Sequence, residues 1–109
     1  MYNDLVKKLL TEVNFEDAVI LPEQIKYCVI DNFSVIEMYI SEEKISFRVY
    51  GDAYMLAMIK WLQKKLQHKA DIKKISLQEL VKEFDLPEFK YRNASQVMEL
   101  IEKINAAVV

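Results

Sequence analysis

Two adjacent stretches of the chain, Ser34–Ser41 and Lys44–Tyr50, alternate apolar and polar residues with a period of two. This period is typical of β-strands that have one buried face. Folding the two stretches about residues 42–43 sets Glu37 opposite Arg48, and opposite charges there favour the pairing by roughly a few tenths of a kcal/mol. The pattern therefore predicts an antiparallel hairpin with a four-residue connection. On its apolar face, this register pairs Ile36 with Val49, Met38 with Phe47, and Ile40 with Ile45.

Helical spacing replaces the alternation directly after the hairpin. Gly51 ends the second strand, and Asp52 belongs to the residue types that cap helix N-termini well. The sequence predicts a helix over Ala53–Gln67 that covers the apolar face of the hairpin and forms the core with it. Its apolar stripe, which Tyr54 and Trp61 widen, consists of Met55, Met58, Ile59, Leu62 and Leu66.

The residues before the hairpin predict one more helix and one more strand. Asn3 or Asp4 can cap a first helix, and Gln24–Ile30 alternates in the way a third antiparallel strand would. Between them, Asn14–Pro22 has no clear period, and Asp17–Leu21 is compatible with either a loop or a short strand. The apolar side of the first helix carries Leu5, Val6, Leu9, Leu10 and Val13.

Two capping signals divide the C-terminal part of the chain. Ser76-Leu-Gln-Glu79 is a capping box that opens a short helix, and Asp85-Leu-Pro87 ends it. Residues 88–92 are predicted to be a loop, and Asn93-Ala-Ser-Gln96 is a second box-like cap for a final helix. That helix presents Val97, Leu100, Ile101, Ile104 and Val108 on one side.

Together these elements predict a single α+β domain over residues 1–109, in the order α-β-β-β-α-α-α. We expect a three-stranded antiparallel sheet that is packed on one face by helices. The length is that of one domain, and a hydrophobic content of 52% provides enough apolar surface for a core without disulfides.

Charge and cysteine content narrow the classes of function. A net charge of −2 argues against general nucleic-acid binding, which needs a strong positive field. No apolar run reaches the ~18 residues that a membrane-spanning helix requires. We expect a cytoplasmic protein, because the N-terminus lacks the basic and apolar regions of a signal peptide and one cysteine suits a reducing compartment.

Single reactive side chains offer few catalytic candidates. Cys28 lies among apolar residues, where a cysteine is more often a small buried hydrophobe than a nucleophile. The alternative is a thiolate that accepts sulfur, which would need an exposed position with positive charge nearby. His68 has no second histidine or cysteine at metal-ligand spacing, so neither a metal nor another cofactor is predicted.

A basic segment over residues 60–74 holds six lysines and one acidic residue. Such a run is usually a solvated face. Its functional alternative is a docking patch for an acidic protein partner, with an affinity that falls as salt rises. The residues proposed for this patch are Lys60, Lys64, Lys65, His68 and Lys69.

Tyr39 and Tyr50 are expected on the face of the hairpin opposite its core side. They either shield the sheet or contribute to an aromatic interface, with a second copy of the chain in a homodimer or with another protein.

The order of elements, together with two short motifs, resembles the SufE/NifU superfamily of iron–sulfur assembly proteins, including the IscU-type scaffolds. Phe47-Arg-Val-Tyr-Gly51 is similar to the scaffold segment in which a strand ends in Tyr-Gly before a ligand cysteine. Leu86-Pro-Glu-Phe-Lys-Tyr-Arg-Asn93 is similar to a Leu-Pro-x-x-Lys-x-His-Cys segment that carries another ligand cysteine. The resemblance extends over residues 25–104, and the spacing between the two motifs is close to that of the family.

The resemblance implies ligand positions that this chain fills with other residues. Asp52 and Asn93 stand where a scaffold has cysteines, the third position falls near Asn32, and Arg92 replaces the histidine. Iron–sulfur clusters are held by soft thiolates, so this set is not expected to hold one. In the SufE branch a single cysteine before the hairpin accepts sulfur, and Cys28 lies within a residue or two of that place.

These observations leave three hypotheses about function. The first is a non-catalytic SufE/NifU-like domain that acts by binding protein partners, for example as an accessory to iron–sulfur or sulfur-transfer assembly. The second is a SufE-type sulfur acceptor that uses Cys28. The third is an unrelated small dimerisation or adaptor module. The residues favour a protein that is not an enzyme.

Overall fold

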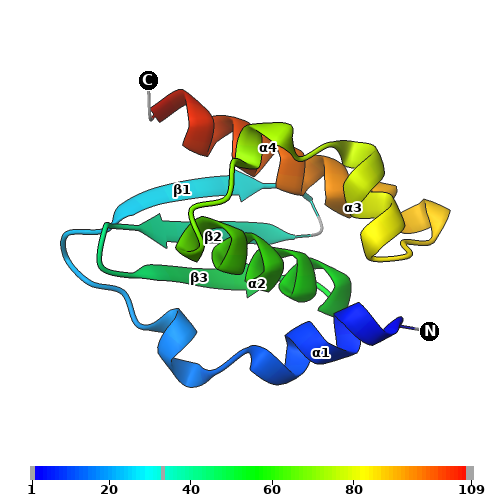
Figure 1. The fold of residues 1–109 in the computed structure, drawn as a ribbon, viewed down its shortest axis with the longest axis horizontal. Helices are drawn as coiled ribbons and strands as arrows, with labels where there is room; N and C mark the ends of the chain where they lie inside the picture. The colour runs from blue at the N-terminus through cyan, green and yellow to red at the C-terminus, as the bar shows by residue number, and fades with distance from the viewer. Residues whose placement is uncertain (1, 33, 108–109) are drawn as a thin grey trace.

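A computed structural model describes residues 2–32 and 34–107 (Figure 1). Three short 3₁₀ helices accompany the regular elements: η1 (Phe15–Ala18), η2 (Ile72–Lys74) and η3 (Glu88–Lys90). Val108, predicted to belong to the last helix, lies outside the described residues. The regular elements are α1 (Asp4–Glu12), β1 (Ile25–Ile30), β2 (Val35–Ile40), β3 (Ile45–Tyr50), α2 (Ala53–Gln67), α3 (Leu77–Glu83) and α4 (Tyr91–Ala107).

The predicted hairpin register is confirmed. β2 and β3 pair antiparallel with Met38 opposite Phe47 and Glu37 opposite Arg48, and residues 41–44 connect them. β1 pairs antiparallel with the other side of β2, so the sheet order over the described residues is β1-β2-β3. Met38 is fully buried and Phe47 is 3% exposed, which places the predicted apolar face in the core.

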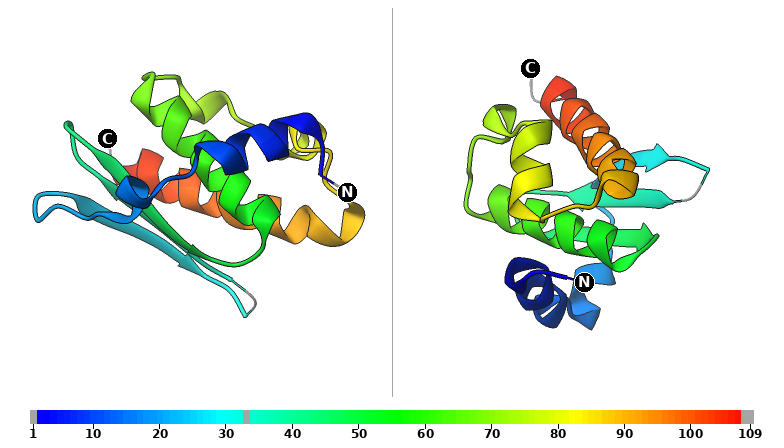
Figure 2. Two further views of the ribbon diagram at one scale, coloured as in Figure 1. Left: turned by 90° about the horizontal axis from the view of Figure 1, so that it is seen from below. Right: turned by 90° about the vertical axis from the view of Figure 1, so that its right-hand side faces the viewer.

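The helices gather on one face of the sheet, as Figure 2 shows most clearly in its left view. α2 packs against β3, α4 lies along β1, and α1 lies beside α2. This confirms the α+β class and the order of helix, three strands and three further helices. The core between the layers is built from side chains such as Ile36, Met58, Leu62, Leu80 and Leu100, all fully buried.

Tyr39 and Tyr50 lie on the opposite face of the sheet, as predicted. Each is next in sequence to a residue of the core face, and successive side chains of a strand point to opposite faces. The two tyrosines differ in exposure: Tyr50 is 60% exposed, whereas Tyr39 is 9% exposed. The segment that leads into β1 contacts this region, because Gln24 donates to the Tyr39 carbonyl oxygen at 3.1 Å. Tyr39 is therefore too buried to contribute its ring to an exposed aromatic interface.

Helix caps agree with the sequence at three of four starts. The side chains of Asn3, Asp52 and Ser76 accept hydrogen bonds from Val6, Met55 and Glu79 backbone N–H groups. The fourth prediction is wrong, because α4 begins at Tyr91 and Asn93 lies within its first turn. Residues 88–90, predicted as loop, form η3 and lead directly into α4, so the helix needs no cap at Asn93.

Candidate functional site

The positions that resemble scaffold ligands converge at one end of the sheet. There the junction between β3 and α2 meets the first turn of α4, although 41 residues separate Asp52 from Asn93. The Asn93 amide nitrogen donates to both carboxylate oxygens of Asp52, at 3.1 and 3.2 Å. The Lys90 ammonium nitrogen lies 2.5 Å from Asp52 Oδ2. We call Asp52, Lys90 and Asn93 the sheet-end cluster.

Gly51 allows this junction to close tightly. A Cβ atom added at Gly51 would lie 3.2 Å from the Cβ of Ser34, which is tighter than an ordinary van der Waals contact. Glycine is thus the residue that lets the chain turn from β3 into α2 beside the start of β2.

The third ligand-like position, Asn32, is exposed and lies beside this cluster rather than within it. Its neighbour Asp31 accepts two hydrogen bonds from Arg92, from Nε and Nη2, both at 3.0 Å. This bidentate pair links the β1–β2 connection to the start of α4. The structure therefore brings Asp52 and Asn93 into contact and ties the Asn32 region to them through Arg92.

Gln96 hydrogen-bonds to the backbone at the same end of the sheet. The sequence did not reveal this structural role. Gln96 is 5% exposed, and its amide nitrogen donates to the carbonyl oxygens of Val29 and Ser34 at 3.3 and 3.2 Å. The Ser34 hydroxyl donates in return to Gln96 Oε1. The only signal in the sequence was the position of Gln96 directly before the apolar residue Val97. The sequence analysis assigned Gln96 to a helix cap instead of to the core.

The surroundings of the Asp52 carboxyl group favour its charged form. Burial raises its pKa, but hydrogen bonds from Lys90, the Met55 backbone and Asn93 outweigh burial and hold the pKa below its usual value of 3.8. The carboxylate is thus ionised at neutral pH and its charge is balanced by Lys90. Among residues 2–32 and 34–107, no group of three or more histidine, cysteine or acidic side chains is arranged to hold a metal ion.

Replacing Asp52 with asparagine tests this balance. Asparagine keeps the cap, so the variant loses mainly the charge interaction with Lys90 and the helix dipole, about 1 kcal/mol at neutral pH. Because the pKa of Asp52 is lowered in the fold, this contribution is present above pH 3.8 and is lost as pH falls through the folded pKa. Urea unfolding of both proteins across acidic pH should show their stabilities converging. A constant difference would contradict the proposed charge effect.

Cys28 lies in the middle of β1, half-buried, with Glu37 opposite it in the register. Its side chain belongs to the face of the sheet away from the helices, together with Lys26 and Arg48 in neighbouring register positions. Its carbonyl oxygen accepts a hydrogen bond from Lys103 of α4 at 2.8 Å. The thiol is neither fully buried nor at a strand end, and it is surrounded by charges of both signs.

The five basic residues proposed as a docking patch do not share one surface. Lys60 is 7% exposed, and its ammonium nitrogen lies 3.0 Å from Asp17 Oδ2, so its assignment to an exposed patch is wrong. Lys64 pairs with Glu12 of α1 at 2.8 Å, and the Lys65 ammonium stands 5.2 Å from the centre of the Trp61 ring. His68 and Lys69 are exposed at the C-terminal end of α2.

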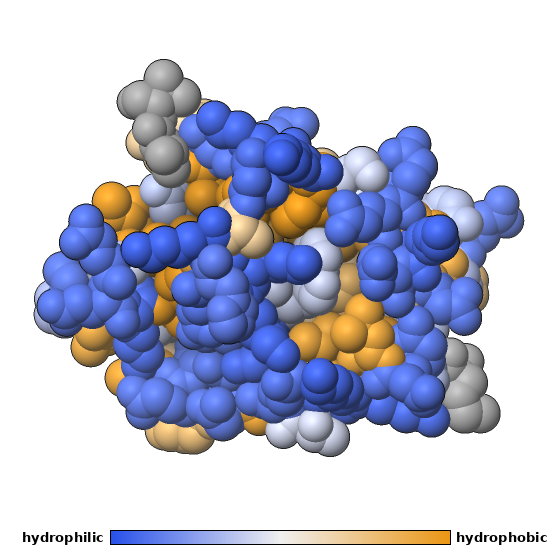
Figure 3. Space-filling model, in the orientation of Figure 1, coloured by the Kyte–Doolittle hydropathy of each residue, from blue (hydrophilic) through white to orange (hydrophobic). Residues whose placement is uncertain are grey.

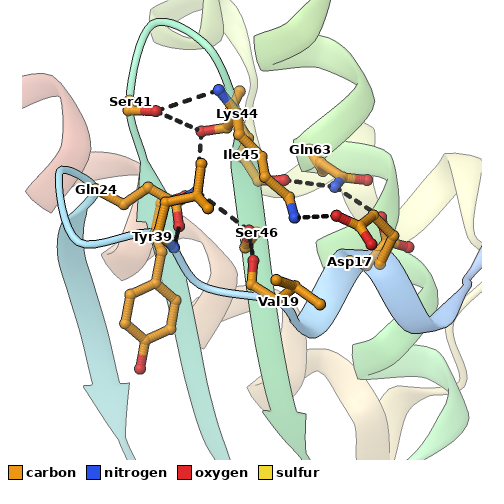
Figure 4. A network of polar contacts seen from close by, with 11 residues as sticks. Asp17, Val19, Gln24, Tyr39, Ser41, Lys44, Ile45, Ser46 and Gln63 are labelled. Carbon is orange, nitrogen blue, oxygen red and sulfur yellow. Dashed lines mark hydrogen bonds and ion pairs between the residues drawn. The ribbon is translucent and has the colours of Figure 1, made fainter.

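Asp17, Lys60 and Gln63 form a buried polar group that the sequence did not reveal. Figure 4 shows the contact between Asp17 and Gln63. Gln63 Nε2 donates to Asp17 Oδ1 at 3.0 Å and to the Ile45 carbonyl oxygen at 2.7 Å. Burial raises the pKa of Asp17, but hydrogen bonds from Gln63, the Asn14 backbone and Lys60 outweigh it and lower the pKa. The group ties η1 to α2 and the edge of β3, beside a cavity of about 820 Å³.

Gln63 leaves one polar atom unsatisfied: in the part of the chain that the structure describes, its Oε1 is buried without a hydrogen-bond partner. The orientation of the amide is nevertheless dictated by its nitrogen, which donates to two acceptors. An unpaired buried carbonyl costs about 1–3 kcal/mol. The three side chains thus hold the N-terminal segment in place, and the geometry gives them no exposed reacting atom.

Three comparisons with known proteins found no counterpart for this chain. No protein-family model, no curated protein and no solved structure matched it. Over the described helices, none is long and apolar enough to cross a membrane.

Proposed function

We propose that this chain is a non-catalytic, SufE/NifU-like domain that acts by binding a protein partner, accessory to iron–sulfur or sulfur-transfer assembly. The observation that carries this proposal is the sheet-end cluster. Asp52 and Asn93 stand at the ligand-like positions and contact each other, and Asp52 also pairs with Lys90, so neither position presents a thiolate. Hard oxygen and nitrogen groups that are already paired are poor ligands for iron–sulfur clusters.

The proposal predicts that the purified chain carries substoichiometric iron and sulfide. The experiment expresses the full chain with added iron and cysteine, isolates it without oxygen, and measures iron, acid-labile sulfide and visible absorption. A variant with cysteine at positions 52 and 93 is the informative companion, since it restores two thiolates at the cluster. Stoichiometric iron and sulfide on the unmodified chain would refute the proposal.

A sulfur acceptor is the second candidate, because the half-exposed Cys28 lies on the sheet face away from the helices. In that reaction the Cys28 thiolate would attack the outer sulfur of a desulfurase persulfide. A Cys28 persulfide would form, and the desulfurase cysteine would leave as its thiolate. Cys28 lies mid-strand opposite Glu37, and the neighbouring Lys26 is itself paired with Glu37 at 3.4 Å, which weakens its support for a thiolate.

Mass spectrometry separates these two functions. After incubation with a cysteine desulfurase and free cysteine, we expect no species that carries one added sulfur atom on Cys28. The Cys28→Ser variant controls for sulfur attached elsewhere. Quantitative persulfide on Cys28 would establish the acceptor function and overturn the non-catalytic proposal. An unrelated dimerisation or adaptor module is the third hypothesis, and a stable dimer in light scattering would favour it.

A further inference from the structure

A small pocket lies between α1 and α2, and three residues of the docking patch predicted from the sequence, Lys64, Lys65 and His68, are in its lining. Its volume is about 310 Å³, and Leu5, Leu9 and Trp61 contribute apolar side chains to its lining. Leu9 and Trp61 are nearly buried, at 2% and 8% exposed, so they form a firm base rather than a mobile surface. Trp61 is also held from behind by Phe84, with the two rings edge-to-face at 5.7 Å. The pocket is therefore preformed.

Basic side chains surround this pocket. Lys8, Lys64 and Lys65 line it, whereas Glu12 is the acidic residue in the lining and is already paired with Lys64. The Lys65 ammonium lies 5.2 Å from the centre of the Trp61 ring. The chain as a whole has a net charge of −2, so the positive charge around this pocket is a local feature of the surface. We call this hollow, with its lining residues Leu5, Lys8, Leu9, Glu12, Trp61, Lys64, Lys65, His68 and Ala70, the basic pocket.

Size and charge together select the occupant. A hollow of about 310 Å³ is at the small end for a drug-sized ligand and accommodates one or two bulky side chains of a peptide. An apolar base with an aromatic residue is typical of the pockets that anchor protein interfaces. Lysines at the rim favour carboxylates next to that anchor and speed their encounter. Apolar surface between hydrophilic residues is visible on the helix side of the molecule (Figure 3).

We propose that the basic pocket binds a partner protein through an acidic segment that carries a bulky apolar anchor. The anchor packs on Trp61 and Leu9, and carboxylates on either side of it pair with Lys8 and Lys65. This inference rests on the proposed protein-binding function and names the partner's chemistry. His68 also lines the pocket.

Trp61 makes the inference directly testable, because it is the one tryptophan in the sequence. The probe is an acetylated, amidated octapeptide with Phe-Leu at its centre and three acidic residues on each side. Titrating it into the full chain should change Trp61 emission saturably, with an affinity that falls several-fold as salt rises from low to physiological levels. Two control peptides replace the acidic residues with lysine or the Phe-Leu pair with serine, and neither should bind.

Matched variants locate the binding. Lys8→Glu combined with Lys65→Glu should weaken the acidic peptide roughly tenfold or more, since two attractive rim charges become repulsive. Lys73→Glu combined with Lys82→Glu makes the same change of charge at exposed positions outside the lining and should leave affinity unchanged. Ala70→Phe places a ring at an exposed position of the lining and should block the anchor without disturbing the core.

Several results would overturn the inference while leaving the proposed function intact. These are a Trp61 signal that does not change with the acidic peptide, equal binding by the lysine peptide, or equal weakening by the two charge-reversal variants. Vesicles of equal parts phosphatidylserine and phosphatidylcholine provide the remaining comparison. An emission change with vesicles but not with the peptide would assign the pocket to an anionic lipid surface instead. Failure of the proposed function would appear separately, as iron and sulfide or as a persulfide on the purified chain.

Discussion

Replacing Asp17 with alanine should lower the free energy of unfolding by about 3–5 kcal/mol, because it leaves the Lys60 ammonium buried without its counter-ion. The side chains of Lys60 and Asp17 are only 9% and 10% exposed, so solvent cannot replace the lost partner. For a domain of this size, such a loss corresponds to a fall in melting temperature of roughly 10–20 °C. Thermal unfolding monitored by circular dichroism and urea unfolding at neutral pH measure the effect.

Two variants make this result specific. Glu16→Ala removes the adjacent acidic residue, whose side chain is 73% exposed and pairs with Lys44, and should cost less than about 1 kcal/mol. Combining Asp17→Leu with Lys60→Met replaces the buried pair by apolar side chains and should recover most of the stability lost in Asp17→Ala. If Asp17→Ala proved as mild as Glu16→Ala, the buried pair would not hold η1 against α2 in the way described.

Replacing Phe84 with alanine should destabilise the fold by about 3–5 kcal/mol. Phe84 is fully buried at the end of α3, and its ring meets Trp61 of α2 edge-to-face. The substitution removes this aromatic contact and leaves a cavity where α2 and α3 meet. Urea unfolding measures the stability, and Trp61 emission in the folded state should shift as its packing partner disappears.

Phe89→Ala is the matched control, since Phe89 is 78% exposed in η3. It changes the same side chain in the same region of the sequence, and its effect should stay within about 0.5 kcal/mol. Equal losses for the two variants would contradict the assignment of Phe84 to the core.

Local patterns determined the elements of this protein and their faces. Alternation in β2 and β3 fixes which side chains meet the core, because shifting the register by one residue would turn Met38 and Phe47 outward. Helical spacing together with Asp52 and Ser76 as caps predicted where α2 and α3 begin, since a cap satisfies backbone N–H groups of the adjacent turn. These signals depend on neighbouring residues, so the sequence alone carries them.

The start of α4 shows where a local signal was insufficient. Asn93 has a residue type that suits a cap, but the helix begins at Tyr91 and the Asn93 amide bonds to Asp52. A capping motif can be recognised from a few residues, but η3 leads directly into α4, and the Asn93 side chain is instead used in a contact with another element.

The candidate sites depended on contacts across the chain. Lys60 looked like one of several solvated lysines, until the fold placed Asp17, 43 residues earlier, against its ammonium group. Arg92 and Asp31 are 61 residues apart, and Lys8 and Lys65 line one pocket only because α1 packs beside α2. Sequence by itself determined strands, helices and core faces through their periods. The tertiary structure alone decided which charges are paired and which surround the basic pocket, because no short-range pattern encodes the distance between remote side chains.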